Sequence, residues 1–205
     1  MDMDLFGKAL VTLLVIMTPL GNVPIFIGLT SRATPRERHR VAWQAVAVAG
    51  LVVMSFAFLG QQMLLYLGIS MASLQVAGGF LLVLVALELM EVSESPRDRN
   101  PDINVAFVPL GTPLLAGPGT IVAIMVLMRQ AGRVPDKLTV VLAVMCVLVV
   151  LWVALRFAAG LARILGVNVI NLITRIMGLL LAAIAAQMIA SGIETFVRHG
   201  ATGVP

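Results

Sequence analysis

The sequence predicts an all-α, polytopic membrane protein with six transmembrane helices, arranged as two inverted three-helix repeats in which helices 1 and 4 are broken. Three observations lead to this fold class. Hydrophobic residues make up 60% of the 205 residues and charged residues 12%, with a mean hydropathy of +1.05, which is typical of membrane proteins. The apolar residues form runs that are long enough to cross a bilayer. A proline-rich motif occurs in the first run and again in the fourth.

The apolar runs cover residues 5–29, 41–66, 70–90, 104–129, 138–160 and 168–196. Each has the roughly 20 residues that a helix needs to span the hydrocarbon core. The second helix is expected to begin with a capping box, because Thr34 precedes Pro35 and Glu37 follows Thr34 by three residues. The uncharged connection around Gly68 turns the second run back into the third. The polar segment 91–103, a predicted cytoplasmic hinge, then separates the first repeat, 1–90, from the second, 104–205.

The repeated motif reads Thr-Pro-Leu-x-x-x-Pro and covers residues 18–24 and 112–118. A proline inside a helix lacks the backbone donor and clashes with the carbonyl four residues earlier. Freed carbonyl groups are therefore expected at Val15, Leu20, Pro109 and Leu114. Irregular backbone at membrane depth is tolerated only where protein or a water-filled cavity satisfies it. Two helices broken at corresponding places therefore predict a binding site. The alternative is that each break is a kink that improves helix packing.

Other landmarks repeat between the two halves. Leu67-Gly68 aligns with Leu165-Gly166, Gly79 with Gly178, and Glu88 with Gln187. Because each half contains an odd number of spans, the second half must cross the membrane in the opposite sense, which makes the repeat an inverted one. Chance similarity between two very apolar segments is the alternative.

The distribution of Lys and Arg predicts the orientation. The first, third and fifth connections contain eight of these residues, whereas the termini and the other two connections contain five: Lys8, Arg129, Arg133, Lys137 and Arg198. Positive charge is retained in the cytoplasm, so the connection from Arg32 to Arg40 is expected inside and both termini outside.

The expected substrate pocket lies between helices 1 and 4, near the middle of the membrane. The N–H groups that follow each break are the positive end of a half-helix dipole, which suits a carboxylate. Glycines allow the backbone to approach a ligand closely, and hydroxyl and amide groups add donors and acceptors. The candidate substrate-binding residues are Thr18, Pro19, Gly21, Asn22, Pro24, Thr112, Pro113, Gly117, Pro118, Gly119 and Thr120.

Glu88 and Arg175 are the ionisable residues placed most deeply in apolar runs. We predict that they form a pair that links the two repeats or belongs to an inner gate. The alternatives are that Arg175 extends to the interface and that Glu88 is simply interfacial.

The motifs of common enzyme classes are missing from the sequence, which has neither H-E-x-x-H nor G-x-S-x-G. His39 and His199 fall in a loop and a tail, and the lone Cys146 lies in an apolar run. We therefore expect no enzyme, no metal site and no cofactor. Nucleic acid is not an expected partner either, because the basic residues lie at the ends of the apolar runs.

Four segments together resemble a known family: 19–26 (Pro-Leu-Gly-Asn-Val-Pro-Ile-Phe), 76–82 (Val-Ala-Gly-Gly-Phe-Leu-Leu), 116–121 (Ala-Gly-Pro-Gly-Thr-Ile) and 175–184 (Arg-Ile-Met-Gly-Leu-Leu-Leu-Ala-Ala-Ile). The chain resembles the MarC family of bacterial and archaeal membrane proteins from end to end. The resemblance implies a six-span, multi-pass protein of the cell inner membrane that is distantly similar to LysE-type amino-acid exporters. Some members are described as transporters of small neutral amino acids such as glycine and alanine.

Three functions follow as hypotheses. The first is a secondary transporter of small neutral amino acids that works by alternating access around the two broken helices. The second is a channel or exporter for another small solute, including the weakly supported drug efflux that the family name implies. The third is a membrane protein that transports nothing. A transporter would have the substrate and the lipid bilayer as partners, with a coupling ion (H+ or Na+) and a homo-oligomer as open alternatives.

Overall fold

The computed structural model describes residues 3–30, 33–90 and 116–199, and within these ranges all regular structure is helical. The predicted all-α class is therefore confirmed for this part of the chain. The elements are α1 (Met3–Met17), α2 (Asn22–Leu29), α3 (Pro35–Leu67), α4 (Met71–Met90), α5 (Pro118–Gln130), α6 (Val134–Arg156) and α7 (Ala158–His199).

Four helical segments of the described chain are long and apolar enough to cross a membrane: α3, α4, α6 and the Asn168–Arg198 part of α7. The α1–α2 pair is a fifth candidate, bent by 43° at its break. This bend agrees with the broken first helix that the sequence predicts. The predicted fourth span, 104–129, is described only from residue 116, where α5 forms its second half. The hinge 91–103 lies outside the described residues.

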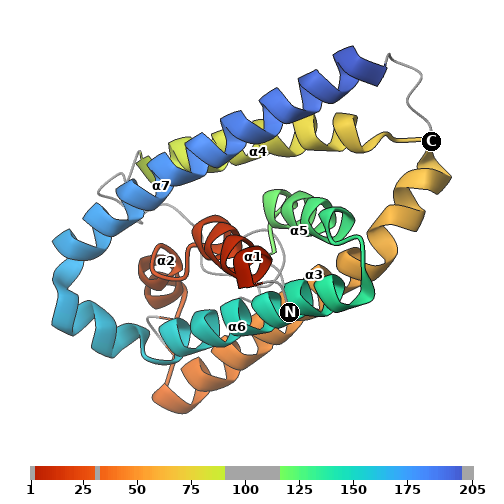
Figure 1. Cartoon of the computed structure of the whole chain (residues 1–205). Helices are drawn as coiled ribbons and strands as arrows, with labels where there is room; N and C mark the ends of the chain where they lie inside the picture. The colour runs from red at the N-terminus through yellow and green to blue at the C-terminus, as the bar shows by residue number, and fades with distance from the viewer. Residues whose placement is uncertain (1–2, 31–32, 91–115, 200–205) are drawn as a thin grey trace.

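The helices form three layers (Figure 1). α3 and α6 pack against each other in one outer layer, and α4 and α7 pack against each other along most of α4 in the other. The middle layer consists of α1, α2 and α5. Here α1 contacts α6 and α5 contacts α3 on one side, while α5 contacts α4 and α2 contacts α7 on the other. The break between α1 and α2 therefore lies inside the protein, between two layers of longer helices.

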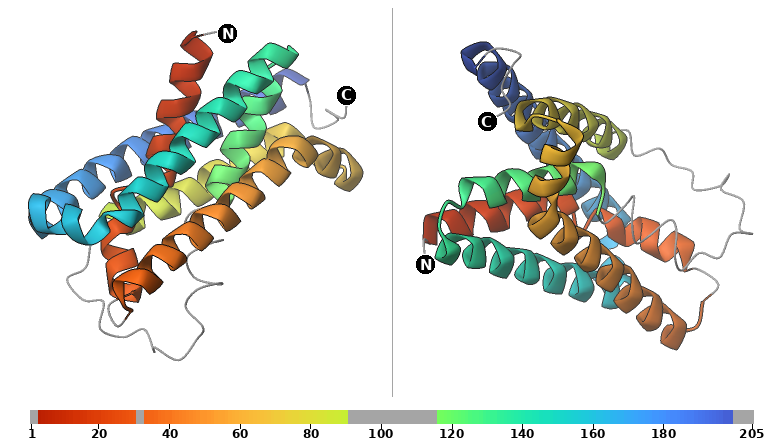
Figure 2. Two further views of the ribbon diagram at one scale, coloured as in Figure 1. Left: turned by 90° about the horizontal axis from the view of Figure 1, so that it is seen from below. Right: turned by 90° about the vertical axis from the view of Figure 1, so that its right-hand side faces the viewer.

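The connections gather at two opposite ends of the molecule (Figure 2, left). The Gly68 end carries the start of α1, the α3–α4 turn and the α5–α6 connection. The Pro35 end carries the α2–α3 connection and the turn between α6 and the long part of α7. Connections that alternate between two ends are what a chain crossing a membrane back and forth requires.

Local sequence signals explain where the outer helices begin and end. The predicted capping box of α3 is present: the Glu37 N–H donates to the Thr34 hydroxyl at 3.4 Å, and the Thr34 N–H donates to Glu37 Oε2 at 2.7 Å. α3 ends at Gly68, which has a φ of 65°, a left-handed conformation that glycine adopts without steric strain. Gly166, with φ 73° and ψ 156°, separates the first turns of α7 from its long apolar part.

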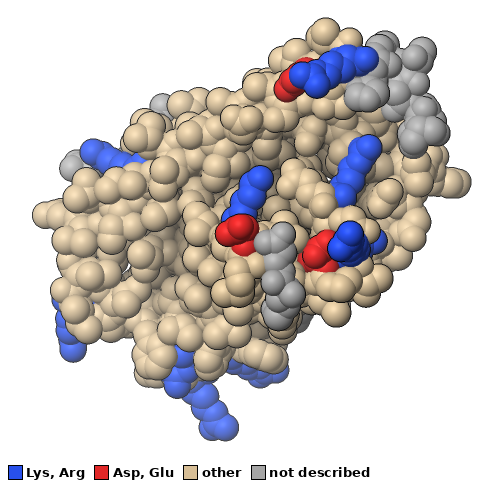
Figure 3. All heavy atoms as spheres, viewed as in Figure 1, with Lys and Arg blue, Asp and Glu red and all other residues tan. Residues whose placement is uncertain are grey.

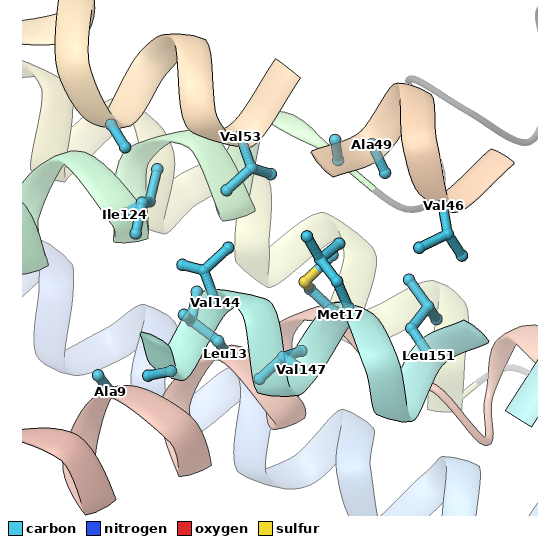
Figure 4. Packing of buried hydrophobic residues seen from close by; sticks show 14 of the residues in the cluster. Ala9, Leu13, Met17, Val46, Ala49, Val53, Ile124, Val144, Val147 and Leu151 are labelled. Carbon is cyan, nitrogen blue, oxygen red and sulfur yellow. The ribbon is translucent and has the colours of Figure 1, made fainter. Parts of the chain in front are cut away.

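The main core lies where α1 and α5 meet α3 and α6, and Figure 4 shows its side chains pointing toward one another. Its members follow helical spacings of three and four residues, which place them on one face of each helix. They include Ala9, Leu13 and Met17 of α1, Val46, Ala49 and Val53 of α3, Ile124 of α5, and Val144, Val147 and Leu151 of α6. Many are small, so neighbouring helices approach closely and gain van der Waals contact, the main source of helix association in lipid.

Glycines bring α4 and α7 together. A Cβ on Gly79 would lie 2.6 Å from Ile189 Cγ1 and 2.9 Å from the Ala185 carbonyl oxygen. Gly192 and Gly178 lie equally close to the α4 backbone, near Ala72 and Ala86. Because a Cβ at these points would crowd the facing backbone, the two antiparallel helices approach each other closely at the glycines.

Candidate functional site

The first break is compact and mostly buried. Helix α1 stops at Met17, the chain turns through Thr18, Pro19 and Gly21, and α2 starts at Asn22. The break is buried at four residues: Thr18, Pro19, Gly21 and Asn22. Pro24, in the first turn of α2, is exposed. Thr18 has a φ of 38°, an uncommon value for a β-branched residue. Strained backbone of this kind persists only where the surrounding structure holds it in place.

Asn22 closes the break from within. Its side-chain amide donates a hydrogen bond to the Met17 carbonyl at 2.8 Å, and the residue is only 4% exposed. The prediction that the Leu20 carbonyl is free is wrong, because this carbonyl accepts a hydrogen bond from the Val23 N–H at 3.2 Å. The tight turn places the Val23 N–H close to the Leu20 carbonyl, three residues earlier. Pro24 does not prevent this hydrogen bond, because it lacks only its own N–H. The freed group that needs a side-chain partner is instead that of Met17.

The second break is described only in part, because Thr112 and Pro113 lie outside the described residues. Gly117 precedes α5 in an extended conformation, and its carbonyl accepts the N–H groups of Thr120 and Ile121 at 2.9 and 3.2 Å. Pro118 is the first residue of α5, where a missing N–H costs nothing. Gly119 and Thr120 are buried. A helix thus begins within the motif in both copies, at Asn22 in the first and at Pro118 in the second.

Two residues that the sequence analysis did not single out lie against these breaks. A Cβ on Gly21 would lie 3.5 Å from Thr174 Cγ2, and Thr174 is a buried residue of α7. Gly119 packs directly on Leu82 of α4. The hydroxyl of Thr174 donates to the Ile170 carbonyl at 2.8 Å. A threonine inside an apolar run was a usable signal for Thr174, whereas nothing in the sequence distinguishes Leu82 from its apolar neighbours.

Apolar side chains pack between the helices that carry the two breaks. A second hydrophobic cluster joins α1, α4, α5 and α7, and consists of Val15, Ile16, Leu82, Ala86, Ala123, Leu181 and Ala185. A cavity with a volume of about 320 Å³ lies at the Gly68 end. None of the predicted substrate-binding residues that the structure describes lines it. The predicted pocket between helices 1 and 4 stays a prediction.

Comparison with known proteins places the chain in a family. The sequence profile described as "MarC family integral membrane protein" matches residues 3–197. The chain belongs to the MarC family. Its resemblance to that family in the four motif segments is therefore confirmed, and the protein is an integral membrane protein.

The relatives match this MarC-family chain over almost its whole length. It is 38% identical to the UPF0056 membrane protein MJ1677 of Methanocaldococcus jannaschii over 201 residues, which cover 95% of this chain and 98% of the relative. It is 32% identical to a UPF0056 membrane protein of Aquifex aeolicus, with 95% of each chain covered. The UPF0056 inner membrane protein MarC of Salmonella typhimurium is 32% identical, with 96% of this chain and 98% of the relative covered. No solved structure matches the chain.

Glu88 and Arg175 of this MarC-family chain lie near the same end of the α4–α7 pair. Gly178, one turn after Arg175, packs against Ala86, Leu89 and Met90 around Glu88. Both ionisable side chains are exposed, and no ion pair joins them within the described part of the chain. The repeat-linking pair stays a prediction.

Among the described residues, no group of three or more His, Cys, Asp or Glu side chains is placed to hold a metal ion. Cys146 is a free, exposed thiol on α6.

Proposed function

We propose that this protein is a secondary transporter of small neutral amino acids, of the size of glycine or alanine, and that the two broken helices form its substrate site. The observation that carries the proposal is the first break: irregular backbone with buried Thr18 and Asn22, enclosed between two layers of long helices. Irregular backbone at membrane depth occurs at the binding sites of many transporters, where it supplies polar groups to the substrate.

The chemistry of the break favours a small zwitterion. The buried polar residues of the two described break segments, and of α7 against the first of them, are Thr18, Asn22, Thr120 and Thr174, none of which is ionisable. A carboxylate would be bound by backbone N–H groups and hydroxyls, and an ammonium group by carbonyl oxygens such as that of Met17. The nearby Gly21 and Gly119 are packed against neighbouring side chains, so little volume is left for a substrate side chain.

An inverted repeat is part of the proposal, and two features support it. Gly68 and Gly166 align in the two halves and both have a positive φ; Gly68 comes shortly before α4, and Gly166 shortly before the long apolar part of α7. The helix contacts are also paired: α4 packs on α5 as α7 packs on α2, and α3 packs on α5 as α6 packs on α2. A two-fold axis in the membrane plane relates contacts in this way.

Alternating access would move the outer layers relative to each other. α4 and α7 contact each other closely through their glycines, and α7 has only a small contact with α6. Both outer layers instead bind the middle layer, which contains the breaks. A relative movement of the layers could then open the break toward one end of the molecule at a time, with the Pro35 end in the cytoplasm and both termini outside.

Uptake into proteoliposomes tests the proposed function. The purified full chain is reconstituted, and the entry of radiolabelled glycine and alanine is measured with no gradient, a proton gradient or a sodium gradient. We expect saturable uptake of both amino acids that one of the two gradients increases. Uptake no faster than in protein-free vesicles under all three conditions would contradict the proposal.

A further inference from the structure

The cavity at the Gly68 end is formed by four helices that meet near the predicted membrane surface. It lies between the second half of α3, the start of α4, the end of α5 and the start of α6, and has a volume of about 320 Å³. Figure 1 shows the end of α5 and the start of α6 beside α3 at this end. None of the described residues at the proposed substrate site contributes to it, so its role does not rest on the proposed function.

The cavity has an apolar wall and a polar mouth. The wall is formed by Phe56, Phe58, Leu65, Met71, Met125 and Met128. Methionine side chains are flexible and polarizable, which lets them adapt to an irregular chain. Gln61 and Gln62 are exposed beside the wall and offer amide donors. A ligand that fills this space must therefore be amphiphilic.

The charge at the mouth is positive. Arg129, in the last turn of α5, and Lys137, near the start of α6, both line the cavity, and the described residues that line it include no acidic one. No ion pair involves either side chain within the described residues. The neighbouring Asp136 is partly buried and does not line the cavity. Figure 3 shows Lys and Arg side chains standing over α5 and the start of α6 on this face.

We infer that this cavity binds an anionic phospholipid. In this proposal the phosphate lies between Arg129 and Lys137, and the glycerol region contacts Gln61 and Gln62. One acyl chain packs along the apolar wall of phenylalanine, leucine and methionine side chains. Arg and Lys both bind phosphate through charge-assisted hydrogen bonds. The two cations flank the α5–α6 connection, at the ends of apolar helices, which is the level at which headgroups lie. An anion without an acyl chain would leave the apolar wall unused.

The test compares a variant of the cavity with a matched charge variant. Arg129→Gln combined with Lys137→Gln removes both cations from the mouth. Arg133→Gln removes an exposed cation from the same connection, at a residue that does not line the cavity. The full chain is purified in detergent, and binding of phosphatidylglycerol is measured by native mass spectrometry and by thermal shift. Phosphatidylcholine with the same acyl chains, oleate and inorganic phosphate are the comparison ligands.

We expect phosphatidylglycerol to bind the wild type and Arg133→Gln with equal affinity. It should bind the Arg129→Gln, Lys137→Gln double variant at least about tenfold more weakly, because the charge-assisted contacts to the phosphate are lost. Exchanging the cations, Arg129→Lys with Lys137→Arg, should retain binding and shows that a loss in the double variant is not caused by misfolding. Equal loss in Arg133→Gln and in the double variant would overturn the site, as would equal binding of phosphatidylcholine. Saturation by phosphate or oleate at the same concentration would overturn the assignment to a phospholipid.

Discussion

The side-chain amide of Asn22 spans the break between α1 and α2 and donates to the carbonyl of Met17 at 2.8 Å. The bond joins the first residue of α2 to the last residue of α1, so it fixes the position of one half-helix relative to the other. It also satisfies a carbonyl that would otherwise lack a partner inside the protein. In this arrangement Asn22 stabilises the break, and a substrate ammonium group could replace it at Met17.

Replacing Asn22 with Leu tests this role. The Met17 carbonyl would lose its partner inside the protein, which costs about 1–3 kcal/mol. We expect the melting temperature in detergent to fall accordingly. Asn168→Leu is the control, because Asn168 is an exposed amide at the start of the long part of α7. A melting temperature for Asn22→Leu equal to that of the control would show that the bond contributes no stability.

Replacing Gly166 with Ala tests the backbone that separates the two parts of α7. Its φ of 73° and ψ of 156° belong to a region that is open almost only to glycine. We expect a loss of about 1–3 kcal/mol of stability. Gly160→Ala is the matched control, because Gly160 lies in the first turns of the same element with nothing within 4 Å of an added Cβ. Equal stability of the two variants would mean that α7 tolerates a regular helix at Gly166.

The glycine contact between α4 and α7 predicts a steric effect. An added Cβ at Gly79 would lie 2.9 Å from the carbonyl oxygen of Ala185, part of the α7 backbone, so Gly79→Ala must push the helices apart. We expect a destabilisation of about 1–3 kcal/mol, the range for overpacked interiors. Gly28→Ala on α2 should have no such effect, because nothing lies within 4 Å of its Cβ position. The measurement is unfolding of both variants under the same detergent conditions, and unchanged stability of Gly79→Ala would contradict the close contact.

The orientation can be tested with single cysteines. In a Cys146→Ser background, Arg36→Cys marks the Pro35 end and Gly132→Cys marks the Gly68 end; both positions are exposed. We expect a membrane-impermeant thiol reagent added to whole cells to label Gly132→Cys and to leave Arg36→Cys unlabelled until the cells are broken. Labelling of Arg36→Cys in intact cells would reverse the topology.

The sequence was sufficient for features that depend on neighbours in the chain. Apolar runs predict the helices, Thr34 and Glu37 predict the capping box, and the prolines at positions 19 and 24 predict the first break. Each of these signals is local, because a cap or a proline acts within one or two turns.

Contacts between distant segments could not be predicted in this way. The bond from Asn22 to Met17 depends on the angle of the turn, and the packing of Gly21 on Thr174 depends on how α2 crosses α7. The lipid cavity brings together residues of α3, α4, α5 and α6 that no single periodicity connects. In a chain with apolar residues on most faces of its helices, the pattern alone does not show which face meets which partner.

The central claim is that the first break belongs to the substrate site, and Gly21→Ala tests it most directly. Gly21 has helical φ and ψ, and an added Cβ would lie in ordinary contact with Thr18 and Thr174, so the variant should fold. The extra methyl group would reduce the space for a substrate. We predict that alanine binding, measured by thermal shift and vesicle uptake, weakens about tenfold in Gly21→Ala, with a smaller loss for glycine. Gly28→Ala, on the α2 helix that follows Gly21, should bind both amino acids as the wild type does. Folded Gly21→Ala protein that binds alanine with wild-type affinity would contradict the claim.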